Sequence, residues 1–359
     1  MTETLPAVDL TAHTVLTPSA HQDTFTRDNL PPPDQWPTFT FDLPELRYPT
    51  RLNCAGELLD RTVERLGANR PCLLDGSGTV WSYGEVLARA NRVARVLVED
   101  LGLVPGNRVL LRGPNSPTLA VCWLAVLKAG GVAVTTMPAL RASELTEICD
   151  MARVRLALCD TRSAEDLLGA DIDGLRVVCY EGGSGGELWR LAAAKPDHFP
   201  NVPTAADDVA LLAFTSGTTG RPKATMHFHR DVLAIADTFS ARVLRPRADD
   251  VFAGSPPLAF TFGLGGLLVF PLRKGAATVL LDRAGPEELF DAAGRHRVSV
   301  LFTAPTAYRR VLPEIDRFDL TSLRRAVSAG EALPAATYQD FLDATGVSLI
   351  DGIGSTEML

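Results

Sequence analysis

The stretch VALLAFTSGTTGRPKATMHFHRD (209–231) decides the fold. Its apolar run VALLAF (209–214) predicts a buried strand, TSGTTGRPK (215–223) predicts a loop, and ATMHFHRD (224–231) predicts a second strand that leads into a helix. The loop packs four hydroxyl side chains, two glycines and two cations into nine residues. Glycines let backbone N–H groups turn toward an anion, and the hydroxyls and cations supply further donors. The loop therefore predicts a polyphosphate site.

Two other interpretations of this loop were weighed. It is not a Walker A loop, because no Gly-Lys-Ser/Thr follows four spacer residues and Pro222 precedes the lysine. Its composition also suits a Ser/Thr/Gly linker. A linker rarely lies between two buried strands of one compact region, however, so the context favours phosphate binding.

Composition limits the classes of protein to consider. Hydrophobic residues make up 46% of the 359 residues and charged residues 22%, which is ordinary for a globular protein. The net charge of −8 gives no overall basic surface for nucleic acid or an anionic membrane. The six cysteines form no CxxC pair, which favours reduced thiols over disulfides or zinc ligands.

No segment predicts secretion or membrane insertion. The first residues lack a basic segment followed by an apolar one. The apolar run from Leu119 to Leu127 stops at Lys128, well short of the roughly 18 residues that a spanning helix needs. We expect a cytoplasmic protein with small-molecule partners and with neither a nucleic-acid nor a membrane partner.

From Pro105 onward, short Val- and Leu-rich runs alternate with helical patterns. This alternation predicts an α/β fold with two doubly wound, mostly parallel sheets and flanking helices. The predicted strands are 108–112, 132–136, 156–159, 176–179, 251–254, 277–281, 298–302, 325–330 and 347–350. The predicted helices include 52–66, one that follows 77–86, one ending at Lys128, one from Ser143, 230–242, 286–296, one from Pro305, and 334–344.

Three regions are expected along the chain. Residues 1–50 carry eight prolines with scattered aromatic side chains, which predicts an extended arm laid over the body. Residues 51–199 are expected to form a first α/β subdomain. Residues 200–359 are expected to form a second one, which contains the phosphate loop.

Three loops follow predicted parallel strands and should lie where α/β sheets bind ligands: 215–223, 328–332 and 351–357. The last contains Asp351, Ser355, Thr356 and Glu357 beside two glycines. A carboxylate next to hydroxyls suits magnesium on a nucleotide. A plain turn with a solvated glutamate accounts for the same residues equally well.

Six stretches resemble, in order, the core motifs of the adenylate-forming superfamily, which includes acyl-CoA synthetases, peptide-synthetase adenylation domains and luciferases. They are VPGNRVLL (104–111), WLAVLKAGGVAVTTMP (123–138), TSGTTGRPK (215–223), SPPLAFTFGLGG (255–266), SAGEALP (328–334) and DGIGSTE (351–357). The resemblance extends from Leu30 to the end. FTAPTAY (302–308) and DGIGSTEML (351–359) resemble benzoate-type aryl-CoA ligases, and FDLPELRYP (41–49) and TMHFHRDVLAI (225–235) resemble 2-aminobenzoate-CoA ligases.

The resemblance implies a two-step reaction. A carboxylate attacks the α-phosphorus of Mg-ATP to give acyl-AMP and pyrophosphate, and the thiol of CoA then displaces AMP. The implied contacts to the β- and γ-phosphates are Thr215, Ser216, Gly217, Thr218, Thr219, Gly220 and Lys223. Thr356 is implied at the α-phosphate and Glu357 at Mg²⁺. The implied adenine site comprises Gly330, Glu331, Asp351 and the loop residues Gly352, Ile353 and Gly354, with Ile353 where many relatives place a tyrosine. Thr356, Glu357 and Lys223 are the implied catalytic residues, acting by positioning and charge stabilisation.

The resemblance also assigns an acid pocket. Phe262 occupies the aromatic position of the family, with Thr261 and Gly263 beside it. Without the motif, Phe262 would be a plain core residue. Thr261 offers a hydroxyl to an ortho substituent. Ala224 replaces the glycine that usually follows the motif lysine.

His227 and His229 stand at strand spacing and have the residue type of metal ligands. No third ligand is evident in the sequence, so a structural role is expected for both.

Members of the superfamily continue into a small carboxy-terminal domain with a catalytic lysine, which this sequence lacks. We therefore expect a fragment that, made alone, is a very poor ligase. Two other functions are kept beside aryl-CoA ligation. One is a non-catalytic binder of ATP or aromatic acid, and the other is an adenylating enzyme that loads a carrier protein.

Overall fold

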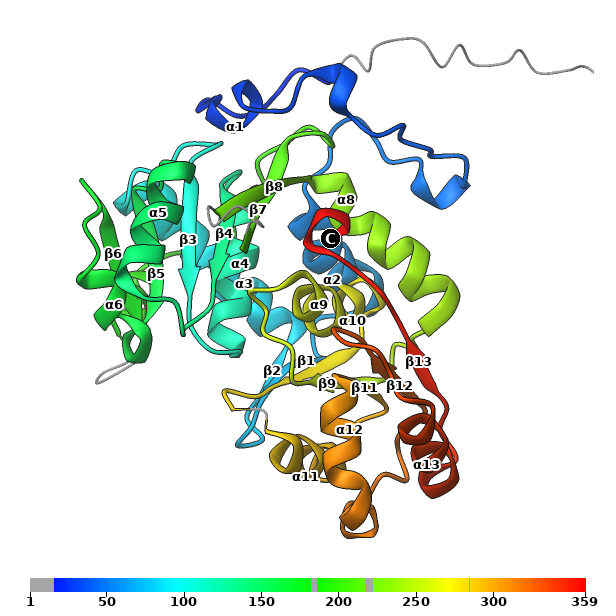
Figure 1. Ribbon diagram of the computed structural model, residues 1–359. Helices are drawn as coiled ribbons and strands as arrows, with labels where there is room; N and C mark the ends of the chain where they lie inside the picture. Colours follow the sequence, from blue (N-terminus) through cyan, green and yellow to red (C-terminus); the bar gives the residue numbers. More distant parts are fainter. Residues whose placement is uncertain (1–15, 182–185, 217–221, 284) are drawn as a thin grey trace, which may run out of the picture.

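Two β-sheets, seen in a computed structural model that describes residues 16–181, 186–216, 222–283 and 285–359, form the frame of the molecule (Figure 1). One has six strands in the order β6-β5-β3-β4-β7-β8, and the other has seven in the order β13-β12-β11-β9-β10-β1-β2. All neighbouring strands are parallel except β7 with β8 and β1 with β2. The predicted fold class is confirmed.

Every strand is short. The six-stranded sheet contains β3 (Arg108–Arg112), β4 (Val132–Thr136), β5 (Leu156–Asp160), β6 (Arg176–Tyr180), β7 (Val209–Ser216) and β8 (Pro222–Phe228). The seven-stranded sheet contains β1 (Pro71–Asp75), β2 (Val80–Ser82), β9 (Val251–Gly254), β10 (Ala277–Leu280), β11 (Val300–Thr303), β12 (Arg325–Ser328) and β13 (Leu349–Asp351).

Some helices begin where the sequence supplies a side-chain cap or an N-terminal proline. Ser82 and Glu85 form a capping box at α3, and Ser116 caps α4 ahead of Pro117. The α-helices are α1 (Phe25–Asp28), α2 (Arg61–Leu66), α3 (Tyr83–Arg95), α4 (Pro117–Lys128), α5 (Ala142–Ala152), α6 (Glu165–Leu168), α7 (Gly186–Ala193), α8 (His229–Ile235), α9 (Thr261–Leu264), α10 (Phe270–Lys274), α11 (Pro286–Arg295), α12 (Pro305–Val311) and α13 (Ala335–Thr345). Wider helical turns extend α8 through Ala236–Leu244 and join α9 to α10 through Gly265–Val269.

Each sheet contains strands from both sides of the predicted boundary between residues 199 and 200. Strands β1 and β2 come from the first half of the chain, yet β1 pairs with β10 of the second half and β2 pairs with β1 at the edge of the same sheet. The hairpin of β7 and β8 comes after residue 200 but pairs with β4 of the first half. The two strands that flank the predicted phosphate loop therefore belong to the six-stranded sheet.

The main hydrophobic core lies between the sheets. All twelve residues of α4 are buried, and one continuous cluster joins it to α3, to inner residues of the six-stranded sheet and to the apolar segment Leu264–Leu272. Separate clusters lie beneath α11–α13 and beneath α5 and α6. Helices thus cover both faces of each sheet, as the unbroken apolar strands require.

The described part of the predicted arm crosses the start of β7 and α8. The Thr17 and Ala20 backbone N–H groups donate to the carboxylates of Asp207 and Asp208, both at 3.0 Å. Trp36 and Phe39 pack on the cluster beneath the six-stranded sheet. The arm therefore braces the base of the β7–β8 hairpin.

The cysteines and the lengths of the helices bear on two of the expectations from the sequence. All six cysteines are free thiols, and five are buried. Among the described residues, no helix has the length and apolar character needed to cross a membrane. The expected cytoplasmic location stays a prediction.

Candidate active site

The β7–β8 hairpin carries the predicted phosphate loop. Its strands extend further than expected: Thr215 pairs with Lys223, and Ser216 pairs with Pro222. The loop predicted over 215–223 is thus wrong at both ends, because these residues complete an antiparallel ladder. Lys223 is exposed. Gly217, Thr218, Thr219 and Gly220 lie outside the described residues, so their assignment stays a prediction.

The loop that follows β13 reaches across to this hairpin. It leaves the seven-stranded sheet with the Gly352 N–H donating to the Ser328 carbonyl oxygen at 2.8 Å. It ends in a short helical turn, Thr356–Met358. His227 Nε2 of β8 lies 2.7 Å from the Thr356 carbonyl oxygen, and Figure 1 shows the chain end beside β7, β8 and α8. The loop after β13 therefore meets strand β8, although the two belong to different sheets.

The contact fixes the tautomer of His227. A carbonyl oxygen can only accept, so Nε2 carries the proton that it donates to Thr356. Thr225 Oγ1 lies 2.9 Å from the same nitrogen and donates to the Ala213 carbonyl oxygen at 3.1 Å. Burial lowers the pKa of His227, although the Thr356 carbonyl and the Glu357 carboxylate oppose that shift. The ring is therefore neutral at pH 7, with a proton held on Nε2.

Glu357 lies in that turn and is exposed. It follows Thr356, whose carbonyl oxygen contacts the hairpin, and the hydroxyls of Ser355 and Thr356 are its neighbours in sequence. Magnesium on a nucleotide typically takes one or two protein carboxylates and completes its shell with phosphate oxygens and water. The donor set fits such an ion.

The predicted adenine residues lie at the ends of β12 and β13. Gly330 has a φ of +92°, a conformation that favours glycine. The Glu331 carboxylate accepts from the Thr306 N–H at 2.8 Å. Hydrogen bonds from the Thr306 side chain and from this N–H lower the pKa of Glu331. Asp351, Ile353 and Gly354 are exposed, and Gly352 is half-buried. These residues share one edge of the seven-stranded sheet, and their role in binding adenine stays a prediction.

The predicted acid-pocket residues begin α9. Phe262 is half-buried and packs against Phe302, with ring centroids 5.7 Å apart. Gly263 is buried against the preceding loop: a Cβ there would lie 2.0 Å from the Pro257 carbonyl oxygen. Thr261 is half-buried. The Phe262 side chain thus packs partly into the core, and its place in an acid pocket stays a prediction.

A cleft of about 320 Å³ opens between the hairpin and the segment that precedes α9. Its lining includes Phe214, Thr215 and Pro222 of the hairpin and Ala259 and Phe260 of that segment. Residues of β4, of α5 and of the connection between them complete it: Thr135, Thr136, Met137, Leu140, Glu144, Glu147 and Ile148. The cleft therefore adjoins both the predicted phosphate site and the predicted acid pocket.

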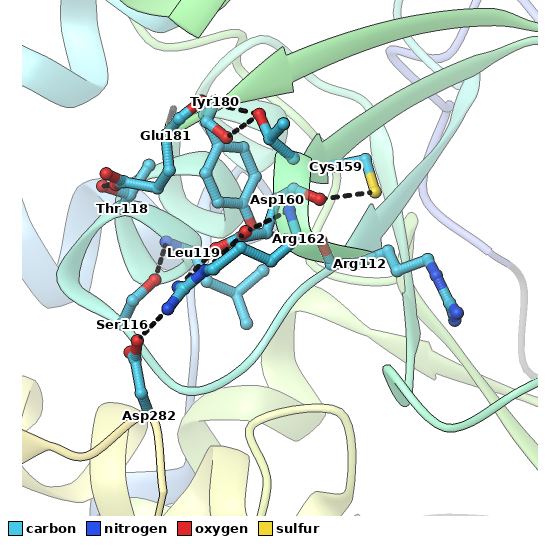
Figure 2. A network of polar contacts seen from close by, with 11 residues as sticks. Arg112, Ser116, Thr118, Leu119, Cys159, Asp160, Arg162, Tyr180, Glu181 and Asp282 are labelled. Carbon is cyan, nitrogen blue, oxygen red and sulfur yellow. Dashed lines mark hydrogen bonds and ion pairs between the residues drawn. The ribbon is translucent and has the colours of Figure 1, made fainter. Parts of the chain in front are cut away.

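A polar network ties the sheets together near the strand ends (Figure 2). Arg162, which follows β5, forms ion pairs with buried Asp160 and with Asp282, which follows β10. Tyr180 donates to the Arg112 carbonyl oxygen at 3.1 Å, and Thr118 donates to Glu181 at 2.7 Å. Arg162 thus links the carboxyl ends of strands from both sheets.

His227 and His229 have different partners. His229 Nδ1 accepts from the Cys54 N–H at 3.2 Å and lies 3.1 Å from Cys54 Sγ, whereas His227 contacts Thr356. Burial lowers the pKa of His229 to about 3. Within the described ranges, no three His, Cys, Asp or Glu side chains gather as a metal site.

Sequence reasoning missed two contributors to the site. It did not link His227 to Thr356, and it did not single out Asn115, whose amide bonds the backbone of the segment before α9. Asn115 follows a predicted strand and precedes a Ser-Pro helix start, a position from which a side chain can reach the strand-end edge. That position in the sequence could have identified Asn115 as a candidate site residue.

The comparisons with known proteins agree with this fold. The sequence model of the family described as AMP-binding enzyme matches residues 59–359. A benzoate–CoA ligase of Thauera aromatica is 32% identical over 326 residues, covering 88% of this chain and 61% of the relative. A crystal structure of the anthranilate CoA ligase AuaEII in complex with anthranoyl-AMP aligns with a TM-score of 0.81 and 29% identity, covering 88% of this chain and 62% of that one. A benzoate CoA ligase from Burkholderia xenovorans LB400 aligns with a TM-score of 0.78 and 28% identity, covering 86% and 62%. The chain thus spans about 60% of the length of these proteins.

Proposed function

Because this chain belongs to the AMP-binding enzyme family, we propose that it carries the nucleotide and acid sites of an aryl-acid-activating enzyme. The proposed reaction joins an aromatic carboxylic acid to AMP from ATP, releases pyrophosphate, and then transfers the acyl group to CoA. The preferred acid is 2-aminobenzoate or benzoate. The names of the similar proteins, which act on benzoate and anthranilate, support this class.

The hydrogen bond between His227 and Thr356 is the observation that carries the proposal. It joins the hairpin, whose loop has a composition that suits phosphate binding, to the loop that contains Glu357, the proposed magnesium ligand. A phosphate chain bound along the hairpin would therefore lie next to a metal-binding oxygen. Such an arrangement suits nucleotide chemistry better than it suits a plain turn.

Each side chain of the proposed nucleotide site is assigned to a phosphate group or to the metal ion. Thr215, Ser216 and Lys223 of the hairpin, with the loop between them, are proposed to hold the β- and γ-phosphates. Thr356 is proposed to contact the α-phosphate and Glu357 to hold Mg²⁺, which when bound neutralises charge on the leaving pyrophosphate. Preorganised donors of this kind stabilise charge that develops during the reaction.

The acid is proposed to bind beside Phe262. The half-buried ring offers an apolar contact for an aromatic acid, and Thr261 offers a hydroxyl for an ortho substituent. We assign the neighbouring cleft to the organic reactants, the acid or the thiol end of CoA. Glu144 and Glu147 line it, and their charges disfavour a polyphosphate there.

Two assays test the proposal. Both use the full-length product of the gene. Acid-dependent exchange of pyrophosphate into ATP reports the first step, and detection of the aroyl-CoA thioester reports the second. Exchange driven by 2-aminobenzoate together with thioester formation supports aryl-CoA ligation. Exchange without thioester favours loading of a carrier protein. Binding of ATP without exchange favours a non-catalytic binder of ATP or aromatic acid.

A further inference from the structure

The segment Pro256–Phe260, called here the substrate loop, is held by the opposite sheet. Asn115, in the loop after β3, donates from Nδ2 to the Pro256 carbonyl oxygen at 3.0 Å. Its Oδ1 accepts from the Leu258 N–H at 2.7 Å. The Asn115 amide thus pairs with one backbone acceptor and one backbone donor of the substrate loop. Together the two hydrogen bonds fix the position of the loop and the direction of its backbone.

A second side chain from the same sheet holds the next turn of the loop. Thr135, near the end of β4, donates from Oγ1 to the Ala259 carbonyl oxygen at 3.2 Å. Asn115 is 6% exposed and Thr135 is 8% exposed. Water therefore cannot easily replace either contact, so the loss of a side chain leaves backbone groups unpaired.

The substrate loop and the start of α9 form one continuous unit. The Phe260 N–H donates to the Pro257 carbonyl oxygen at 3.0 Å, and the Leu264 N–H donates to the Phe260 carbonyl oxygen at 2.8 Å. Gly263 packs so closely on Pro257 that no Cβ fits. A shift of the loop at Pro256 must therefore move Thr261 and Phe262.

We propose that Asn115, assisted by Thr135, is a positioning residue that sets acid selectivity by fixing the substrate loop. The inference rests on the proposed function, since it takes Thr261 and Phe262 as the wall of the acid pocket. The Asn115 amide hydrogen-bonds to backbone groups of the substrate loop, and its effect on the acid passes through that loop. It should therefore affect acid binding and leave nucleotide binding at the hairpin in place.

The test measures dissociation constants by calorimetry on the 359-residue chain. The ligands are three probes: ATP with Mg²⁺, the non-hydrolysable adenylate mimic 2-aminobenzoyl-sulfamoyl-adenosine, and its benzoyl counterpart. The variants are Asn115→Leu, Asn115→Asp and Thr135→Val. Asn115→Asp keeps the acceptor for Leu258 and loses the donor to Pro256, and it serves as the second variant where Asn115→Leu does not fold.

Asn91→Leu is the matched control. Asn91 is also buried, at 5% exposed, and its amide also donates to a backbone carbonyl, that of Asp197 at 2.8 Å. It lies on α3 and holds a different segment. This variant should lose stability without any change in the ratio of the two aroyl affinities.

We expect Asn115→Leu and Asn115→Asp to weaken binding of the 2-aminobenzoyl mimic about tenfold and to change the ratio between the two mimics, with ATP affinity within twofold of wild type. Thr135→Val should act in the same direction by a smaller factor. Unchanged aroyl affinities, or aroyl and ATP affinities that fall in parallel, would overturn the inference alone. A wild-type chain that binds ATP but neither mimic would overturn the inference and the proposed function together.

Discussion

His227 Nε2 donates a hydrogen bond to the Thr356 carbonyl oxygen, at 2.7 Å, between residues 129 positions apart in the chain. His227 belongs to the edge strand of the six-stranded sheet, and Thr356 belongs to the loop that leaves the last strand of the seven-stranded sheet. The bond therefore joins the two halves of the proposed nucleotide site.

Loss of this bond should weaken nucleotide binding. His227→Leu removes the donor and leaves the Thr356 carbonyl unpaired, so we expect the affinity for Mg-ATP to fall about tenfold. His227→Gln keeps an N–H donor and should recover part of the affinity. Calorimetry measures both, with exposed His198→Leu as the control. Equal affinities for the wild type and His227→Leu would show that the bond does not position the loop.

Glu357→Gln should impair magnesium-dependent adenylation while the fold stays intact, because the change removes one charge from an exposed loop and no packing volume. The loss should be roughly 10²-fold if the carboxylate acts as a single preorganised electrostatic group. The measurement is the rate of pyrophosphate exchange against Mg²⁺ concentration. Glu314→Gln, at an exposed glutamate in the 3₁₀ helix Leu312–Arg317, provides the control. An unchanged Mg²⁺ dependence would remove Glu357 from the site.

Acidification should destabilise the fold through His229. Burial lowers its pKa from 6.5 to about 3, so between these values the unfolded chain binds a proton that the folded chain does not. The free energy of unfolding therefore falls as pH drops below 6.5, by about 1.4 kcal/mol per pH unit for this one group. Urea unfolding at pH 7.5 and 5.5 measures the effect.

His229→Asn isolates that contribution. The amide oxygen can accept from the Cys54 N–H in place of Nδ1, and it does not titrate. The variant should lose less stability than the wild type over the same pH interval, whatever its stability at pH 7.5. The same pH dependence in both proteins would mean that His229 does not cause it.

Aromatic acids should be preferred over fatty acids. An apolar ring contact at Phe262 suits a flat acid, and a hydroxyl at Thr261 suits an ortho amine, so 2-aminobenzoate should exceed benzoate. A pocket that hydrogen-bonds the amine loses that bond with benzoate, and the unpaired buried group is costly. A panel of acids in the exchange assay measures the order, and better activity with medium-chain fatty acids would contradict it.

Most of the fold could be predicted because its strands are short apolar runs that alternate with capped helices. Arg108–Arg112, Val132–Thr136 and Val251–Gly254 were predicted to the residue. Strands β1 and β2 were missed, since β2 is only three residues long and is partly exposed. Their membership of the far sheet depends on pairing between β1 and β10, about 200 residues apart in sequence, which no local pattern encodes.

The site was predictable in its parts and not in its assembly. The residue types in the hairpin and in the loop after β13 indicated phosphate and magnesium chemistry separately. Their contact depends on the packing of two sheets, and a histidine such as His227 has the same local sequence whether or not it meets Thr356. Asn115 was missed for the same reason, because its partners lie more than 140 positions away.

The central claim is that one site on this chain holds a nucleotide and an aromatic acyl group side by side. Calorimetric titration of the 359-residue chain with 2-aminobenzoyl-sulfamoyl-adenosine, set beside the octanoyl counterpart and AMP, tests it most directly. The account predicts that the aroyl mimic binds with one-to-one stoichiometry and at least tenfold more tightly than either of the others. Equal affinity for all three, or tighter binding of the octanoyl mimic, would contradict it.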